Sequence, residues 1–150
     1  MHNYIIFALN FSSMNLSSNT ETVNMPAERL YTLLSAFCDT TSPAFQELKK
    51  MADITPMENG FGFNSTMING VVKLKDAMPL TRVTYSIDTD KKISGEATFL
   101  INSQDDTHTD LQIKADAEVP FLLKAFIEKP LQDAMNQIVR RIKEMVEQQA

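Results

Sequence analysis

The sequence predicts an α+β domain: an antiparallel sheet of about six strands, covered by one long C-terminal helix, with two short helices after the first strand. Three observations predict it. Apolar residues recur at helical spacing from Pro130 to Gln149, apolar and polar residues alternate in five segments between Gly60 and Val119, and two short helical patterns follow Pro26 and Pro43.

The C-terminal helix carries one continuous apolar stripe, whose members are Leu131, Ala134, Met135, Ile138, Val139, Ile142, Met145 and Val146. A helix of that length spans roughly 28–30 Å, about the width of a small domain. We therefore expect an equally wide apolar surface beneath it. Pro130 is expected to start or kink this helix, after a short helical approach from Val119 to Lys129.

Residues 1–13 differ in character from the rest of the chain. A secretory signal has a positively charged region before its apolar run and a small-residue cleavage site after it. The apolar run Tyr4–Leu9 has neither. It is also too short to span a bilayer. We expect residues 1–13 to be a dispensable leader and residues 14–150 to form a single domain. A degenerate signal and an extra edge strand are the weaker alternatives.

The first strand is predicted within Asn15–Val23, which is mostly polar and compatible with β-structure. Pro26 occupies an apparent first helical position, and this helix is expected to end near Cys38. Ser42 followed by Pro43 is a good helix start and predicts a second, shorter helix.

Five strands follow. Their alternation places one apolar and one polar face on the sheet, which is typical of an antiparallel sheet with one wet side. Short connections predict a meander, with Asn69-Gly70 as a tight turn and Asp76–Pro79 and Asp88–Lys92 as further turns. The inward positions include Phe61, Phe63, Ser65, Met67, Val72, Leu74, Val83, Tyr85, Ile87, Ala97, Phe99, Ile101, Leu111, Ile113, Ala115 and Ala117.

Composition limits the function. The net charge of −5 and dispersed basic residues argue against a nucleic-acid surface, which needs clustered Lys and Arg. The single cysteine allows no intramolecular disulfide, so we expect a reducing, cytoplasmic compartment. No cofactor or metal motif is present, no segment is long enough to cross a membrane, and the oligomeric state cannot be predicted.

The order of elements resembles the helix-grip fold of the START-like, or SRPBCC, superfamily, over about residues 14–149. Val23–Tyr31 is similar to that superfamily's strand exit, and Pro120-Phe121 with Lys129–Leu131 looks like the helix start of a small, mostly uncharacterised bacterial subgroup. Met25 departs from the small residue usual before the proline. The resemblance implies a curved sheet gripping the long helix, with a cavity between them that takes apolar ligands; polyketide cyclases in the superfamily do chemistry there.

A cavity of that kind would be lined by inward strand positions and covered by the long helix. The expected ligand-binding residues are Phe63, Met67, Tyr85, Phe99, Ile113, Phe126 near the mouth, Met135, Ile138, Val139 and Ile142. This set is almost uncharged, so the first hypothesis is a non-enzymatic binder or carrier of an apolar small molecule or lipid. The alternatives are an interaction or structural module with a filled core, and a cyclase- or dehydratase-type enzyme. No catalytic residue is predicted.

The remaining polar candidates have structural interpretations. His108 lies among Asp105, Asp106 and Asp110 in a polar hairpin, where turns are naturally rich in Asp. Asp116 and Glu118 share the wet face of their strand. Tyr85 is inward, and its hydroxyl needs a partner or could orient a ligand. Cys38 has no basic neighbour in sequence to make it reactive.

Overall fold

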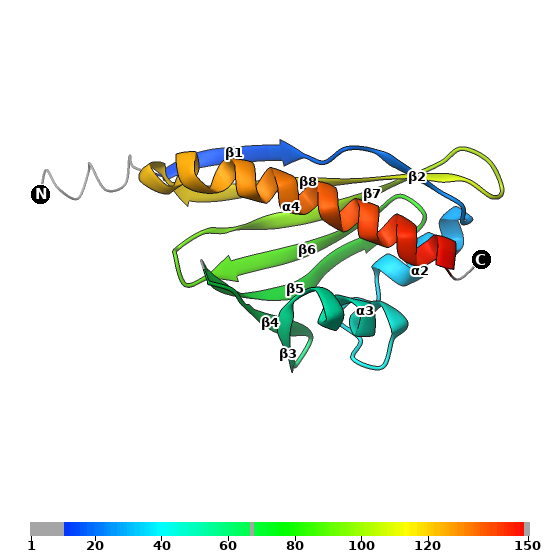
Figure 1. The fold of residues 1–150 in the computed structure, drawn as a ribbon, viewed down its shortest axis with the longest axis horizontal. Helices are drawn as coiled ribbons and strands as arrows, with labels where there is room; N and C mark the ends of the chain where they lie inside the picture. Colours follow the sequence, from blue (N-terminus) through cyan, green and yellow to red (C-terminus); the bar gives the residue numbers. More distant parts are fainter. Residues whose placement is uncertain (1–10, 67, 149–150) are drawn as a thin grey trace, which may run out of the picture.

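The computed structural model describes residues 11–66 and 68–148 and confirms the predicted α+β helix-grip architecture. An antiparallel sheet in the order β1-β8-β7-β6-β5-β4-β3, with β2 also paired to β8, lies under the long helix α4 (Figure 1). The strands are β1 Phe11–Ser17, β2 Glu21–Val23, β3 Asp53–Met57, β4 Gly60–Asn64, β5 Asn69–Met78, β6 Arg82–Thr89, β7 Ser94–Ser103 and β8 Thr109–Pro120. The helices are α2 Ala27–Leu34, α3 Pro43–Met51 and α4 Phe121–Gln148.

Helix α4 is one continuous helix, rather than a short approach followed by a long helix that begins at Pro130. Pro130 lies inside it and is exposed. A proline there removes one hydrogen bond to the carbonyl four residues earlier. On an exposed face water can satisfy that carbonyl, so the helix passes through the proline. The predicted stripe is otherwise buried or half-buried, except for Ala134, which is exposed.

The predicted meander is present from β4 to β8, but two of its turns are displaced. β5 continues to Met78, so the turn into β6 lies at residues 79–81 rather than at Asp76–Pro79. Asn69 and Gly70 begin β5 and pair with Asn64 and Phe63 of β4, so they are not the turn. The main-chain N–H of Ser65 instead donates to the carbonyl of Ile68 at 3.1 Å. This hydrogen bond closes the turn between β4 and β5, which therefore precedes Asn69-Gly70. Gly70 has no positive φ, so the conformation that makes Asn-Gly a turn signal is not used.

One strand, β3, was missed, and the first predicted strand is divided into β1 and β2. β3 is an edge strand in which only Ile54 is buried, and it contains Pro56, so no apolar alternation marks it. β2 is separated from β1 by residues 18–20, and its three residues all pair with the start of β8. The sheet therefore has eight strands where about six were predicted.

Both short helices are present, and the first is shorter than predicted. α2 ends at Leu34, because the next residues form turns rather than helix. Pro26 is its N-cap and no side chain caps it, whereas the Ser42 hydroxyl accepts a hydrogen bond from Phe45 N at 3.1 Å and caps α3.

Within the described residues the sheet already includes Phe11, three residues before the predicted domain boundary. Phe11, Ser12 and Ser13 pair with Pro120, Val119 and Glu118. The other leader residues, 1–10, lie outside the described residues. Whether residues 1–13 are dispensable stays a prediction.

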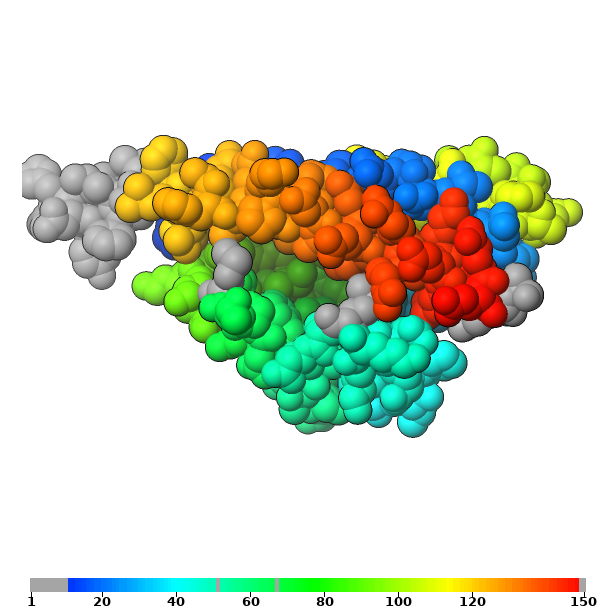
Figure 2. Space-filling model, viewed as in Figure 1, coloured from blue at the N-terminus to red at the C-terminus, as the bar shows by residue number. Residues whose placement is uncertain are grey.

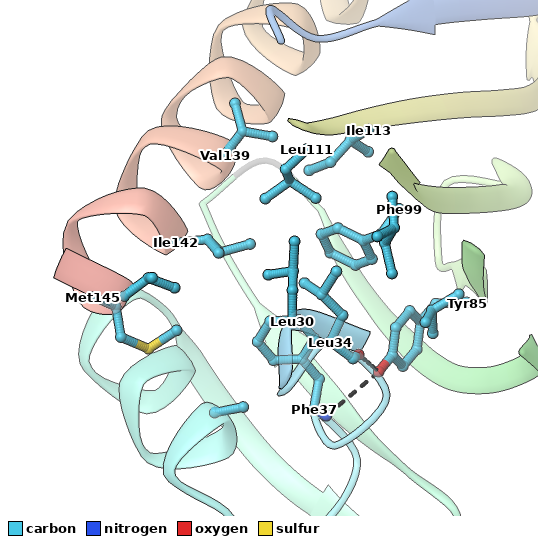
Figure 3. Close-up of a cluster of buried hydrophobic side chains, with 14 of the residues drawn as sticks. Leu30, Leu34, Phe37, Tyr85, Phe99, Leu111, Ile113, Val139, Ile142 and Met145 are labelled. Carbon is cyan, nitrogen blue, oxygen red and sulfur yellow. Dashed lines mark hydrogen bonds between the residues drawn. The ribbon is translucent and has the colours of Figure 1, made fainter. Parts of the chain in front are cut away.

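The main core lies where α2 and the C-terminal half of α4 meet the inner face of the sheet (Figure 3). A smaller cluster of Met14, Ile93 and Val119 lies under the first half of α4, against Ile127 and Leu131. The main core holds α4 over β8, which leaves the face of the helix toward β4–β6 available for the candidate site.

Candidate ligand cavity

An apolar cavity of about 180 Å³ lies between the C-terminal half of α4, helix α3 and the inner face of the sheet. A hollow in this region is visible in Figure 2, between α4 in orange and red and the green strands below it. Its lining residues are Phe37, Glu47, Leu48, Phe61, Val72, Tyr85, Ile87, Ala97, Phe99, Ile138, Arg141, Ile142, Glu144, Met145 and Gln148.

Short side chains at the centre of the sheet help to explain why space remains there. Ala97 of β7 lies between Tyr85 of β6 and Ala115 of β8 in one cross-strand row, and Ala97 lines the cavity. A larger inward residue at Ala97 would reach toward Ile138 and Ile142 on α4. The short side chain of Ala97 therefore leaves volume that the side chains of α4 do not fill.

A second cross-strand row supplies one wall. Phe61, Val72 and Ile87 face one another across β4, β5 and β6, and all three line the cavity. Phe61 also packs edge-on against Phe45 of α3, with 6.4 Å between ring centroids. The buried ring of Phe45 therefore supports this wall of the cavity.

Three aromatic rings form the inner wall. Phe37 follows α2, and its ring centroid lies 5.6 Å from that of Phe99 on β7 and 6.1 Å from that of Tyr85 on β6. Tyr85 and Phe99 meet edge to face, with centroids 6.0 Å apart. Such pairs stabilise beyond simple area burial, so this wall is rigid and apolar (Figure 3).

The hydroxyl of Tyr85 is held by main-chain groups rather than directed to a ligand. It donates to the carbonyl of Leu34, and Phe37 N donates to it at 3.4 Å. Burial raises the pKa of Tyr85, the nearby Cys38 raises it further, and the Phe37 hydrogen bond opposes both. The hydroxyl therefore stays protonated at neutral pH.

Polar side chains are confined to the edge where α3 faces α4. Arg141 and Glu144 of α4 form an ion pair at 3.7 Å, and Glu47 of α3 pairs with Lys50 at 3.0 Å. These side chains are substantially exposed, and Gln148 lies beside them in the lining. The site thus combines an apolar interior with a charged rim, and a bound molecule would keep any charge at that rim.

The predicted ligand-binding residues separate into groups. Tyr85, Phe99, Ile138 and Ile142 line the cavity. Ile113, Met135 and Val139 are buried in the core but lie outside the lining, because they fill the contact between α4 and β8. Phe63 is half-buried against the core, Phe126 is 73 % exposed on the first half of α4 rather than near the mouth, and Met67 lies outside the described residues.

Several lining residues were not predicted. Phe61, Val72, Ile87 and Ala97 were recognised as inward positions, but their register across the sheet is not encoded locally. Leu48 and Phe37 come from the short helices, whose placement over the sheet no local pattern reveals. The sequence did contain one indication of the cavity. Two inward alanines on neighbouring strands show where the side chains on the inner face of the sheet are short.

The polar candidates lie away from the cavity. Asp105 accepts hydrogen bonds from the main-chain N–H groups of Thr107 and His108, each at 2.8 Å, and closes the β7–β8 turn. The main-chain bond from Thr107, with the His108 ring and the Thr107 hydroxyl, lowers the pKa of Asp105 to about 2. Asp116 and Glu118 are exposed. No group of three or more His, Cys, Asp or Glu within residues 11–66 and 68–148 could hold a metal ion.

Cys38 is half-buried at the end of the segment that carries Phe37. Burial raises the pKa of its thiol, although a hydrogen bond with the main chain of Leu74 opposes the shift. The thiol is therefore protonated at neutral pH and a poor nucleophile.

The arrangement of the sheet and the gripped helix matches solved structures. A START superfamily protein from Mycobacterium smegmatis superimposes with a TM-score of 0.66 over 91% of this chain and 99% of that one, at 14% identity. The chain has a START-like fold. A conserved protein from Geobacillus kaustophilus matches with a TM-score of 0.64 at 12% identity, over 90% of this chain and 96% of that one.

Enzymes share this START-like fold. Norcoclaurine synthase from Thalictrum flavum, solved as a point mutant with a transition state analogue, matches with a TM-score of 0.68 at 11% identity, over 93% of this chain and 97% of the enzyme. At such identities the likeness establishes the fold and no activity. The sequence matches no protein-family model and no curated protein. Among the described residues, no helix is long and apolar enough to cross a membrane.

Proposed function

We propose that the protein binds a small, mostly apolar molecule in the cavity between α4 and the sheet, as a carrier or sensor and without transforming it. The observation that carries the proposal is the apolar lining with charged groups only at its rim. Burial of apolar surface supplies the binding free energy, at roughly 25 cal/mol per Å². A START-like fold, which is suited to ligand binding, supports the proposal.

The cavity size restricts the ligand. Ligand sites typically enclose about 300–1,000 Å³, whereas this one encloses about 180 Å³. An apolar cavity of roughly 150 Å³ in another protein holds one benzene molecule. We therefore propose a ligand with an apolar body of about one ring or a short alkyl chain. A fatty acid would require α4 to move away from α3.

The rim determines where a polar group of the ligand lies. Arg141, Glu144 and Glu47 stay in contact with water, so a ligand charge beside them keeps its hydration. A charge deep in the cavity would meet apolar side chains (Phe, Ile, Val, Leu, Met and Ala) and the ring of Tyr85, at a cost of several kcal/mol. The proposed orientation is therefore apolar end inward and polar end at the rim.

Catalysis by the same cavity has less support. Tyr85 is the titratable side chain of the inner wall, and its hydroxyl is committed to Leu34 and Phe37 with a raised pKa. A general acid or base works best with a pKa near the working pH. The unfilled volume, in turn, favours a binder over an interaction module with a filled core.

Native mass spectrometry of the protein purified from its host tests the proposal. We expect a co-purifying small molecule that extracts into organic solvent. The Ala97→Phe variant, in which a ring fills the cavity, should lose it. Recovery of the unliganded mass alone, together with failure of small apolar probes to bind, would favour the interaction module. We also predict a cytoplasmic location and no nucleic-acid partner.

A further inference from the structure

Strand β3 forms one end of the sheet, and among the described strands it pairs with β4 alone (Figure 1). Asp53, Thr55, Pro56 and Met57 are exposed, and Ile54 is buried. An edge strand of this kind presents main-chain donors and acceptors with which a strand of another molecule can pair. Within the described part of the chain, no residue of β3 lines the ligand cavity, so this edge is a separate surface.

The hairpin between β3 and β4 determines which main-chain groups face the open edge. Its loop has two residues, so the residues that flank it, Met57 and Gly60, form a hydrogen-bonded pair. Hydrogen-bonded and non-hydrogen-bonded pairs alternate along an antiparallel ladder. The main chain of Thr55 therefore also bonds to β4. The main-chain groups of Ile54 and Pro56 point the other way, toward the open edge.

Pro56 occupies a position at which the missing N–H of proline affects only this edge. A proline has no main-chain donor, and within sheets it is found on edge strands with the N–H side facing solvent. Its place opposite Phe61, in a pair that exchanges no hydrogen bonds, agrees with this rule. We propose that Pro56 closes the β3 edge to strand addition, and that the partner it excludes is a second copy of this chain.

The rest of β3 would suit pairing with itself. In an antiparallel arrangement centred on Thr55, Ile54 of each copy faces position 56 of the other, and Asp53 faces position 57. No like charges oppose each other in this register, and the central Thr–Thr pair is favourable. The two outward donors of each copy would be the N–H groups at positions 54 and 56. Proline removes the second of them in both copies, which is why we infer that the edge stays unpaired.

Restoring the donor tests the proposal in the full-length chain. Pro56→Thr supplies an N–H at position 56 and a residue type that is common in strands. Met57→Thr is the matched control, because it places the same residue at the next exposed position, whose main chain already bonds to β4. Analytical ultracentrifugation over a range of concentrations gives the mass of the parent and of both variants. Hydrogen exchange measured by mass spectrometry reports on the protection of residues 53–57.

We expect the mass of Pro56→Thr to double relative to the parent at high micromolar concentration. Exchange of residues 53–57 in this variant should slow several-fold over the same range. The parent and Met57→Thr should change in neither measurement. A Pro56→Thr variant that keeps the mass of the parent would overturn the proposal, and so would association that leaves residues 53–57 unprotected. Equal association of Met57→Thr, or a parent that already gains protection at residues 53–57 with concentration, would also overturn it.

Discussion

The hydroxyl of Tyr85 on β6 donates a hydrogen bond to the main-chain carbonyl of Leu34, the last residue of α2. Carbonyls in the last turn of a helix lack partners within the helix, so this contact caps α2 from the sheet. It fixes the turn that carries Phe37, and Phe37 forms part of the cavity wall. One side chain therefore links the sheet, the helix end and the candidate site.

Tyr85→Phe should destabilise the protein by about 1–3 kcal/mol, because it leaves a buried carbonyl without its partner. At this chain length that corresponds to a melting temperature lower by roughly 2–4 °C for each kcal/mol. Thermal unfolding measures it. Tyr31→Phe is the control, since the described residues offer the Tyr31 hydroxyl no hydrogen bond; equal losses in both variants would rule out the cap.

The stability that Tyr85 contributes to the folded protein should decrease at alkaline pH. Burial raises its pKa in the folded protein above the ordinary value of 10.0. A raised folded pKa gives stability that is complete below the unfolded pKa and is lost as pH rises through the folded value. Urea unfolding of the parent and of Tyr85→Phe should therefore differ less at about pH 11 than at about pH 8. A constant difference would contradict this.

Val139→Asp should prevent stable folding, whereas the neighbouring Arg140→Asp should be nearly neutral. Val139 is fully buried between α4 and the sheet, and Arg140 is exposed. An unpaired buried carboxylate costs several kcal/mol, a large part of a total stability of about 5–15 kcal/mol. The soluble yield and the circular dichroism of the two variants provide the comparison. Similar behaviour of both would mean that α4 is not docked on the sheet.

Ser42→Ala should destabilise α3 and the turn before it. The Ser42 hydroxyl caps Phe45 N and also donates to the carbonyls of Ala36 and Asp39, at 2.7 and 2.8 Å. Loss of an N-cap costs about 0.5–2 kcal/mol. Denaturant unfolding should show this loss, and Ser42→Asn, which keeps an acceptor, should restore part of it. No change in Ser42→Ala would exclude the capping role.

The architecture was predictable because its strongest signals are local. The apolar stripe of α4 and the alternation in β8 can each be read within one segment, and the order of the elements supported the resemblance. β3 was not predicted because an exposed edge strand that contains Pro56 needs no alternation of apolar and polar residues. The Asn69-Gly70 turn was misplaced because a turn motif also fits an extended strand, and pairing with β4 decided between them.

The site was predictable only in part, because a cavity depends on register and on helix placement. Ile138 and Ile142 lie on the stripe together with Val139, and only the position of α4 over the sheet separates lining from core. Phe126 was expected at the mouth because it is apolar and close to the long helix. It lies instead on a different face of α4, half a helix away from the cavity.

Isothermal titration of the protein with indole, a ligand that matches a cavity of about 180 Å³, tests the binding proposal most directly. We predict one site with a dissociation constant of roughly 0.1 mM, equivalent to about 5.5 kcal/mol. Ala97→Phe, on the inner face of β7, should abolish binding, while Asn102→Phe, on the outer face of the same strand, should preserve it. Absence of binding to the parent, or equal binding to both variants, would contradict the account.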